Sequence, residues 1–352
     1  MAELLPGIQA QQVTTSRVRT NVLSRTGQTE GEPVVLVHGN ISSALFFQEL
    51  LLALPWEYRG LAPDLRGFGE TEAVPIDATR GLGDFADDLA ALLAALNIWQ
   101  AHFVGWSMGG GAVMQLLISH PELVRSLTLI DPVSPYGFGG TKGVDGELCA
   151  PDGAGSGGGA ANPEYVRRLR EGDRGADDPN TPRNVMNAFY FKPPFRSRLE
   201  ETFMDSMLMT RIGDDFYPGD MRPSEHWPTV APGDRGVLNT MAAGRPRLDG
   251  IIAVSPKPPI LWVRGDSDLI VSDQSMLDFG TLGSLGYVPG WPGAEVMPPQ
   301  PMVSQMRAVL QRYQAAGGSY SEEVIENAGH SPFIEQPARF HEVFFAHLAR
   351  AR

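Results

Sequence analysis

Short apolar runs alternate with an amphipathic helical pattern over the first third of the chain. Three apolar runs have the length of buried strands, and they are 34–37, 101–104 and 126–130. Between them, four apolar residues fall on one face of a predicted helix over 84–96, namely Phe85, Leu89, Leu92 and Leu96. An earlier stretch, 13–24, alternates enough to predict a strand or hairpin. Strands that alternate with helices predict the α/β class, with a mostly parallel sheet flanked by helices.

This rhythm stops after residue 133 and resumes at Ile260. Residues 137–159 are very rich in glycine, and short helical pieces among many prolines and arginines follow up to about residue 250. We therefore expect a core in two parts with a mainly helical insertion between them, over 1–133, 134–257 and 258–352. The Gly-rich stretch has two interpretations, a flexible linker or an ordered loop that approaches a site with its backbone.

A second irregular stretch, 280–301, contains Tyr287, Trp291 and several prolines. Long excursions of this kind are usually functional or disordered, and the aromatic residues and prolines favour order. We expect this stretch to form a wall of a pocket or a lip that faces the insertion.

The most informative motif is Gly105-Trp106-Ser107-Met108-Gly109, which lies between a strand pattern and a helix pattern. A serine on such a turn must adopt a strained backbone conformation, and glycines two residues before and after it remove side chains that would collide there. The following helix N-terminus favours developing negative charge. We therefore expect Ser107 to be a nucleophile.

A serine nucleophile needs a histidine base and a carboxylate that orients it. In this arrangement both follow the serine, each on a loop after a later strand. The strand pattern at 259–264 leads into a loop with Asp268, and the one at 323–326 leads into a loop with His330. The backbone N–H groups of Asn40 and Met108 are placed to form an oxyanion hole.

These residues resemble the motifs of α/β-hydrolase-fold enzymes. The matching pieces occur in the family's order, as His38-Gly39, Asp64-Leu65-Arg66-Gly67-Phe68-Gly69, the Ser107 turn, the Asp268 loop and Gly329-His330. The resemblance implies the α/β-hydrolase fold, a Ser107–His330–Asp268 triad without a cofactor, and a cap in place of the insertion. The family's spacing selects Asp268, while Asp266 on the same loop and Asp131 after the preceding strand remain alternatives.

We expect Trp106, Ile41 and Phe138 to contact the substrate. The side chain of Asn40 has two interpretations, a donor to the substrate or a turn former after Gly39. The sequence contains no paired histidines or His-Cys cluster with metal-ligand spacing, so no metal site is expected.

The net charge of −13 argues against nucleic acid and anionic membranes as partners. Neither a signal peptide nor an apolar run of membrane-spanning length is visible, and the single cysteine, Cys149, permits a reducing compartment. We therefore expect a cytoplasmic protein without membrane insertion. A homodimer is left open.

The expected activity is hydrolysis of a carboxylic ester or lactone of a mainly apolar small molecule, through an acyl-enzyme. Two other classes remain open. In one, the same triad acts on an amide or a carbon–carbon bond or in perhydrolysis; in the other, the fold serves as a non-hydrolytic ligand receptor.

Overall fold

A mostly parallel sheet of eight strands forms the core of the structure, a computed structural model that describes residues 3–352. The strand order is β1-β2-β4-β3-β5-β6-β13-β14. The pairs β1·β2 and β2·β4 are antiparallel, and every other neighbouring pair is parallel. The strands are β1 (Ile8–Thr14), β2 (Arg19–Arg25), β3 (Glu32–Val37), β4 (Tyr58–Pro63), β5 (Ala101–Trp106), β6 (Val124–Ile130), β13 (Ile260–Gly265) and β14 (Tyr320–Ile325).

The α/β-hydrolase fold predicted from the sequence is confirmed. The three apolar runs are β3, β5 and β6, and the alternating stretch at 13–24 belongs to the β1–β2 hairpin. Strand β4 was not predicted, because Gly60 and Pro63 interrupt its short apolar run.

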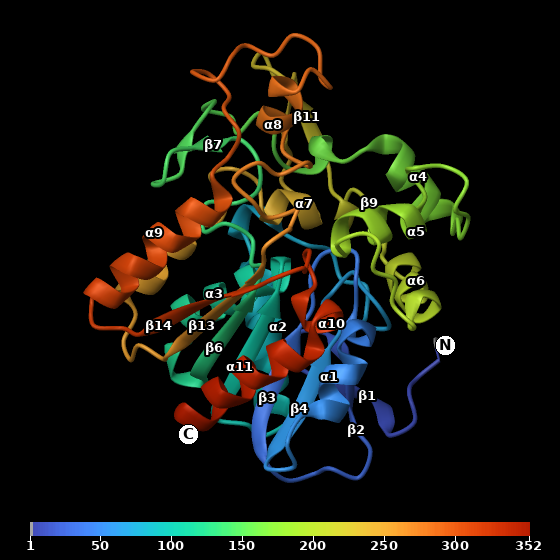
Figure 1. Ribbon diagram of the computed structural model, residues 1–352, viewed down its shortest axis with the longest axis vertical. Helices are drawn as coiled ribbons and strands as arrows, with labels where there is room; N and C mark the ends of the chain where they lie inside the picture. Colours follow the sequence, from blue (N-terminus) through green and yellow to red (C-terminus); the bar gives the residue numbers. More distant parts are fainter. Residues whose placement is uncertain (1–2) are drawn as a thin grey trace.

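Helices cover the sheet, and α11 crosses in front of it in Figure 1. The predicted helix at 84–96 is α2, which packs on α3, and its residues Phe85, Leu89 and Leu92 are buried. The helices of the core are α1 (Gln48–Ala53), α2 (Gly83–Ala95), α3 (Met108–Ser119), α9 (Met302–Ala315), α10 (Pro332–Glu335) and α11 (Pro337–Arg350), with the 3-10 turns η1 (Ala44–Phe47), η2 (Ala78–Arg80) and η3 (Pro121–Leu123). None of the helices within residues 3–352 combines the length and apolar character needed to cross a bilayer.

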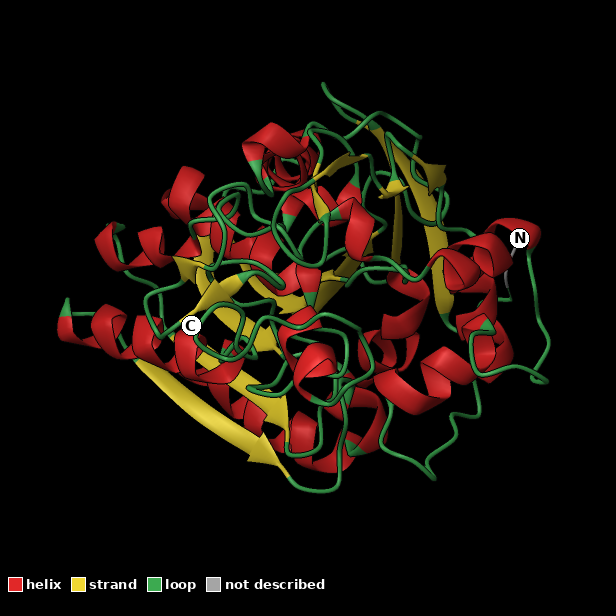
Figure 2. Cartoon of the chain, turned by 90° about the horizontal axis from the view of Figure 1, so that it is seen from above, coloured by secondary structure: helices red, strands yellow, loops and turns green. Residues whose placement is uncertain are grey.

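The segment between β6 and β13, which we call the insertion, adds none of its described residues to the large sheet. Most of it lies above the sheet in Figure 1, and the view from above shows loops and short helices in front of the strands (Figure 2). Its helices are η4 (Gly158–Ala160), α4 (Pro163–Glu171), α5 (Pro182–Val185), the π-helical η5 (Met186–Tyr190), α6 (Glu200–Leu208), α7 (Val237–Thr240) and η6 (Leu248–Ala253). Its strands are β7 (Thr141–Lys142), β8 (Glu147–Leu148), β9 (Ile212–Gly213), β10 (Tyr217–Pro218), β11 (Met221–Pro223) and β12 (Val230–Pro232).

The insertion is therefore less regular than the mainly helical one expected from the sequence. Helices follow one another from α4 to α6, but three two-stranded sheets and long turns make up much of the remainder. Prolines and glycines set these turns, and they carry no hydrophobic period from which a short strand pair could be predicted.

The Gly-rich stretch is an ordered loop, so the interpretation as a flexible linker is wrong. The N–H of Phe138 donates to the Met241 carbonyl at 2.7 Å, and that of Gly155 donates to the Val230 carbonyl at 3.0 Å. The N–H of Gly139 donates to the side chain of Gln300 at 2.6 Å. Gln300 lies near the end of the second irregular stretch, which overlaps α8 (Phe279–Ser284), so that stretch faces the insertion as expected.

Candidate active site

Ser107 occupies a strained turn between β5 and α3. Its φ of 57° and ψ of −123° lie in a region that residues with a side chain rarely adopt. Its N–H donates to the carbonyl of Ile130 in β6 at 2.9 Å. Its own carbonyl accepts from the N–H groups of Gly110 at 3.0 Å and Val133 at 3.1 Å. These bonds hold the serine in a conformation that it would not adopt on its own.

The glycines around Ser107 are required by close backbone approach. A Cβ on Gly105 would lie 2.5 Å from the Gly109 carbonyl oxygen, and a Cβ on Gly109 would lie 2.3 Å from that of Val37. A Cβ on Gly39 would lie 2.8 Å from the Cβ of Ser107. The predicted reason for the flanking glycines is thereby confirmed, and the Gly39 loop lies directly against the serine.

His330 and Asp268 meet on the loops that follow β14 and β13. The imidazole Nδ1 lies 2.8 Å from Asp268 Oδ2, and the two side chains are 2% and 4% exposed. The other carboxylate oxygen accepts from the Ile270 N–H at 2.7 Å. Because Nδ1 faces a carboxylate it carries the proton, which leaves Nε2 as an acceptor. Within residues 3–352 this buried Nε2 has no hydrogen-bond partner.

Trp106 connects the serine turn to the His330 loop. Its indole N–H donates to the backbone carbonyl of His330 at 2.7 Å, and the two rings are 5.7 Å apart between centroids. Among the described residues no hydrogen bond joins Ser107 Oγ to His330 Nε2. Such bonds are often long before substrate binds. Trp106 is 1% exposed, so its contact in the structure is with the protein, and its role in substrate binding stays a prediction.

The three competing aspartates differ in what they contact. Asp268 is bonded to His330. Asp266 points elsewhere, accepting from the Ser267 hydroxyl at 2.7 Å and lying 3.9 Å from the Lys192 ammonium. Asp131 is 2% exposed at the end of β6, and its carboxylate accepts from the Gly265 N–H at 3.2 Å. One oxygen of Asp131 lies within 4.8 Å of both Asp268 and His330.

Asp131, Asp268 and His330 are residue types that also bind metal ions. Nitrogen and oxygen ligands around a tetrahedral Zn²⁺ at about 2.0–2.1 Å lie roughly 3.3 Å apart. The 2.8 Å between His330 Nδ1 and Asp268 Oδ2 is instead the length of a hydrogen bond. As arranged, the group fits an acid–imidazole pair.

Of the two predicted oxyanion donors, Met108 directly follows Ser107 and Asn40 belongs to the loop that packs against it. The N–H of Met108 is the first of α3, so it has no carbonyl partner inside the helix. Asn40 follows Gly39, the residue in closest approach to the serine. The side chain of Asn40 has its Oδ1 atom buried and without a partner in the part of the chain described. Its donation to a substrate stays a prediction, as do substrate contacts by Ile41, which is 5% exposed, and by the half-buried Phe138.

Tyr190 was missed by the sequence analysis. Its hydroxyl donates to the carbonyls of Asn40 at 3.0 Å and Ile41 at 3.2 Å, and its ring packs edge-on against Trp106 at 5.7 Å. It ends the π-helical turn η5, a geometry that is frequent at functional sites. The aromatic run Phe189-Tyr190-Phe191 in a polar region was the one signal that could have identified it.

Glu335 was also not predicted from the sequence. Its buried carboxylate accepts from the N–H of Gly329, next to His330, at 2.8 Å and from that of Lys192 in the insertion at 2.6 Å. Burial raises the pKa of this carboxyl above its usual range. The side chain therefore joins the His330 loop to the insertion.

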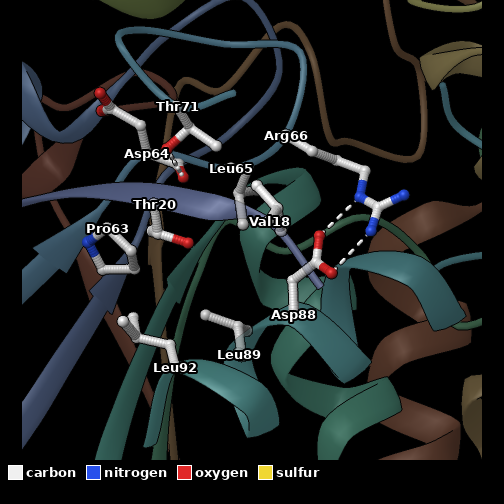
Figure 3. A pocket seen from close by; sticks show the side chains of 10 residues that line it. All are labelled: Val18, Thr20, Pro63, Asp64, Leu65, Arg66, Thr71, Asp88, Leu89 and Leu92. Carbon is white, nitrogen blue, oxygen red and sulfur yellow. Dashed lines mark hydrogen bonds and ion pairs between the residues drawn. The ribbon is translucent and has the colours of Figure 1, made fainter. Parts of the chain in front are cut away.

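The motif 64–69 has a structural role. Asp64 accepts from the N–H groups of Ala44 at 2.8 Å and Glu70 at 2.9 Å, and Arg66 forms a two-bonded pair with Asp88 (Figure 3). The cavity beside them has a volume of only about 10 Å³, which is at the lower limit for one water molecule. A substrate does not fit there.

A larger hollow, of about 510 Å³, lies within the insertion. Its walls include apolar residues such as Phe189 and Phe195, and they also include the polar or charged residues Asp177, Asp178, Asn184, Asn187 and Arg196. Phe189 directly precedes Tyr190, which contacts Trp106. The hollow and the serine turn are therefore separated by one short stretch of the insertion.

The sequence also resembles known hydrolases. A family model of the alpha/beta hydrolase fold matches residues 32–143, about a third of the chain. A 2-hydroxymuconate semialdehyde hydrolase from Pseudomonas sp. (strain CF600) is 31% identical over 189 residues, which is 53% of this chain. The match spans 61% of that enzyme, and the chain spans less than two thirds of the curated relatives it matches.

Solved structures align over nearly the whole chain. The esterase RhEst1 from Rhodococcus sp. ECU1013 is 21% identical, with a TM-score of 0.58 over 97% of this chain and 99% of the other. The carboxylesterase CesB from Bacillus subtilis is 16% identical, with a TM-score of 0.57 over 97% of this chain and 91% of the other. At these identities the likeness establishes the fold.

Proposed function

Because the chain belongs to the α/β-hydrolase-fold superfamily, we propose that it is a serine hydrolase that cleaves a carboxylic ester or lactone. Ser107 is the nucleophile, His330 the base and Asp268 the orienting acid. The observation that carries this proposal is the 2.8 Å bond from His330 to Asp268, with a free Nε2, beside a serine in a strained turn.

The reaction follows from these positions. Substrate brings Ser107 Oγ and His330 Nε2 into contact, and Nε2 takes the hydroxyl proton as Oγ attacks the carbonyl carbon. Asp268 holds the Nδ1–H tautomer and stabilises the imidazolium. The N–H groups of Met108 and Asn40 donate to the oxyanion. His330 then protonates the leaving alcohol, and water attacks the acyl-enzyme with His330 again as base.

The insertion acts as the cap in this proposal, over residues 134–257. Two contacts support this role, since the Tyr190 hydroxyl bonds to the Asn40 loop and the Ser206 hydroxyl lies 2.7 Å from that of Ser43. Aromatic rings also gather beside the serine turn, with Phe46 stacked on Phe203 of the insertion at 4.1 Å. Apolar walls favour apolar acyl or alcohol groups over charged ones.

A panel of p-nitrophenyl esters with graded acyl chains tests the proposal, with Ser107→Ala as the control. We expect faster hydrolysis of the longer or aromatic esters than of the acetate, and loss of turnover in the variant. Equal rates across the panel contradict a cap over the serine. Turnover that survives Ser107→Ala contradicts the nucleophile. Lactones, amides and peracid formation in the same assay then identify the bond.

A second candidate is hydrolysis of a carbon–carbon bond beside a ketone. It is favoured by the 31% identity to a hydrolase named for a semialdehyde, a compound without an ester bond. The same three residues serve this reaction. A dienoate substrate turned over faster than any ester or lactone of the panel would select it.

A further inference from the structure

Asp131 is a buried acid beside the triad that the proposed mechanism does not use. It ends β6, whose neighbour in the sheet is β13, and the Asp268 loop follows β13. The neighbouring strands therefore place two carboxyl groups and the His330 imidazole together, with ligand-type atoms of all three within 4.8 Å. All three residues are buried.

The conformation of Asp131 is held from two sides. Its φ is 38°, in the left-handed region that residues with a side chain rarely adopt. Its N–H donates to the Val263 carbonyl at 2.9 Å, and its carboxyl accepts from the Gly265 N–H at 3.2 Å. Aspartate and asparagine are among the residues that tolerate this region best. The strain is thus carried by a residue whose carboxyl lies within 4.8 Å of that of Asp268.

We propose that Asp131 is a neutral carboxylic acid that donates a hydrogen bond to Asp268 and so positions the acid of the triad. It is a positioning residue, because it acts on His330 only through Asp268. The inference rests on the proposed function, since it assumes that Asp268 and His330 do the chemistry.

Two carboxylates this close cannot both be ionised in a buried site without a large cost in free energy. Burial raises the pKa of Asp131 well above its usual range, and the neighbouring Asp268 raises it further. Asp268 accepts hydrogen bonds from the Ile270 N–H at 2.7 Å and the His330 Nδ1–H at 2.8 Å, which places the proton of the pair on Asp131. Asp131 receives only the longer bond from Gly265.

The other charged groups around Asp131 do not change this assignment. Arg264 of β13 lowers the pKa of Asp131, but by less than burial and the neighbouring Asp268 raise it. Its guanidinium is engaged with Glu322 of β14 at 2.8 Å. Glu335 interacts with the charge of Asp268, and its own carboxyl accepts from the N–H groups of Gly329 and Lys192.

Two substitutions at Asp131 separate the neutral donor from an ionised acid. Asp131→Asn keeps the shape, the neutral charge, an oxygen for Gly265 and a donor for Asp268, and it tolerates the left-handed conformation. We expect it to lose less than about tenfold in kcat and to keep the acid limb of the pH profile of kcat/KM. Asp131→Ala removes the donor, and we expect kcat to fall about 10- to 100-fold with little change in KM.

An ionised Asp131 predicts a different result. Asp131→Asn would then remove a negative charge near His330, and the acid limb would move to lower pH by about one unit or more. That shift overturns the inference, and so does an Asp131→Ala variant as active as wild type. If Asp131→Ala does not fold, the pH profile of Asp131→Asn decides alone. Asp266→Asn, on the same loop as Asp268, is the control for loss of a nearby charge.

The same assay includes Ser107→Ala and Asp268→Asn. Activity that survives these two changes contradicts the proposed function whatever happens at Asp131. Loss of activity in both, together with a shifted profile in Asp131→Asn, contradicts only the inference about Asp131.

Discussion

At the scale of single residues, the orientation of His330 depends on one carboxylate with two fixed oxygens. Asp268 Oδ1 accepts a backbone N–H and Oδ2 faces the imidazole, so the side chain has little freedom to rotate. Serine hydrolases need such an acid to keep the histidine in the tautomer that can accept the serine proton. This gives Asp268 a role that its neighbours on the loop do not share.

Asp268→Asn is therefore expected to lower kcat/KM on the order of 10⁴-fold, by analogy with the buried acid of serine proteases. The amide can donate to Nδ1 and so favours the wrong tautomer. The measurement is steady-state hydrolysis of the best ester of the panel. Asp266→Asn removes the same charge two residues away and should change the rate by less than about threefold. A larger loss at Asp266 than at Asp268 would show that the acid is misassigned.

Tyr190 carries a second prediction at this scale. Tyr190→Phe keeps the ring against Trp106 and removes the hydroxyl that bonds to the Asn40 and Ile41 carbonyls. We expect kcat/KM to fall about tenfold, because the Asn40 loop, which is proposed to bind the oxyanion, loses its bond to the insertion. Tyr165→Phe is the matched control, since within the described residues the buried Tyr165 hydroxyl has no partner. Similar losses in both variants would argue against a special role for Tyr190.

At the scale of elements, the contact between β5, α3 and the end of β3 is too close for a side chain. Gly109→Ala in α3 puts a Cβ 2.3 Å from the Val37 carbonyl oxygen, so the helix must shift. We expect a loss of about 1–3 kcal/mol in the free energy of unfolding, measured with urea, and a loss of activity. Gly83→Ala in α2 meets only Arg80 Cβ at 3.4 Å and should stay within about 1 kcal/mol of wild type. Equal losses of stability in Gly109→Ala and Gly83→Ala would show that the backbone around Gly109 has room for a side chain.

Features within one local stretch of chain could be predicted from the sequence, whereas contacts between distant elements could not. The Ser107 turn is local, so strand, glycines and helix could be identified from a few consecutive residues. Asp268 and His330 needed the order of the family's motifs, because no local pattern pairs residues 62 positions apart. The nearness of Asp131 to Asp268 follows from β6 and β13 being neighbours, which the chain order hides behind the insertion. Tyr190 and Glu335 lie in stretches of prolines and short helices, where the sequence has no hydrophobic periodicity from which their positions could be predicted.

At the scale of the whole molecule, buried neutral histidines make stability depend on pH. His347 in α11 is 5% exposed, and burial lowers its pKa from 6.5 to about 4. The unfolded chain therefore binds more protons between these values, and stability falls as the pH drops from 6.5 towards 4. His38, with its pKa also lowered to about 4 by burial, adds to this effect.

The substitution His347→Gln should remove the part of this pH dependence of stability that is due to His347. Between pH 7 and pH 5 we expect wild type to lose about 2 kcal/mol more of its free energy of unfolding than the variant does. Urea denaturation at both values gives this difference directly. The raised pKa values of Asp131 and Glu335 act in the opposite direction, but they are common to both proteins and cancel. Parallel pH dependences would show that His347 titrates normally in the folded state.

Covalent labelling tests whether Ser107 is the nucleophile of a hydrolase. The protein is treated with a serine-directed organophosphonate, and the adduct is located by mass spectrometry of the intact chain and its peptides. We predict one adduct, on Ser107, whose formation parallels the loss of turnover. A Ser107→Ala variant that folds as wild type does should form no adduct. An adduct on any other serine, or ester hydrolysis that persists in Ser107→Ala, would contradict the account.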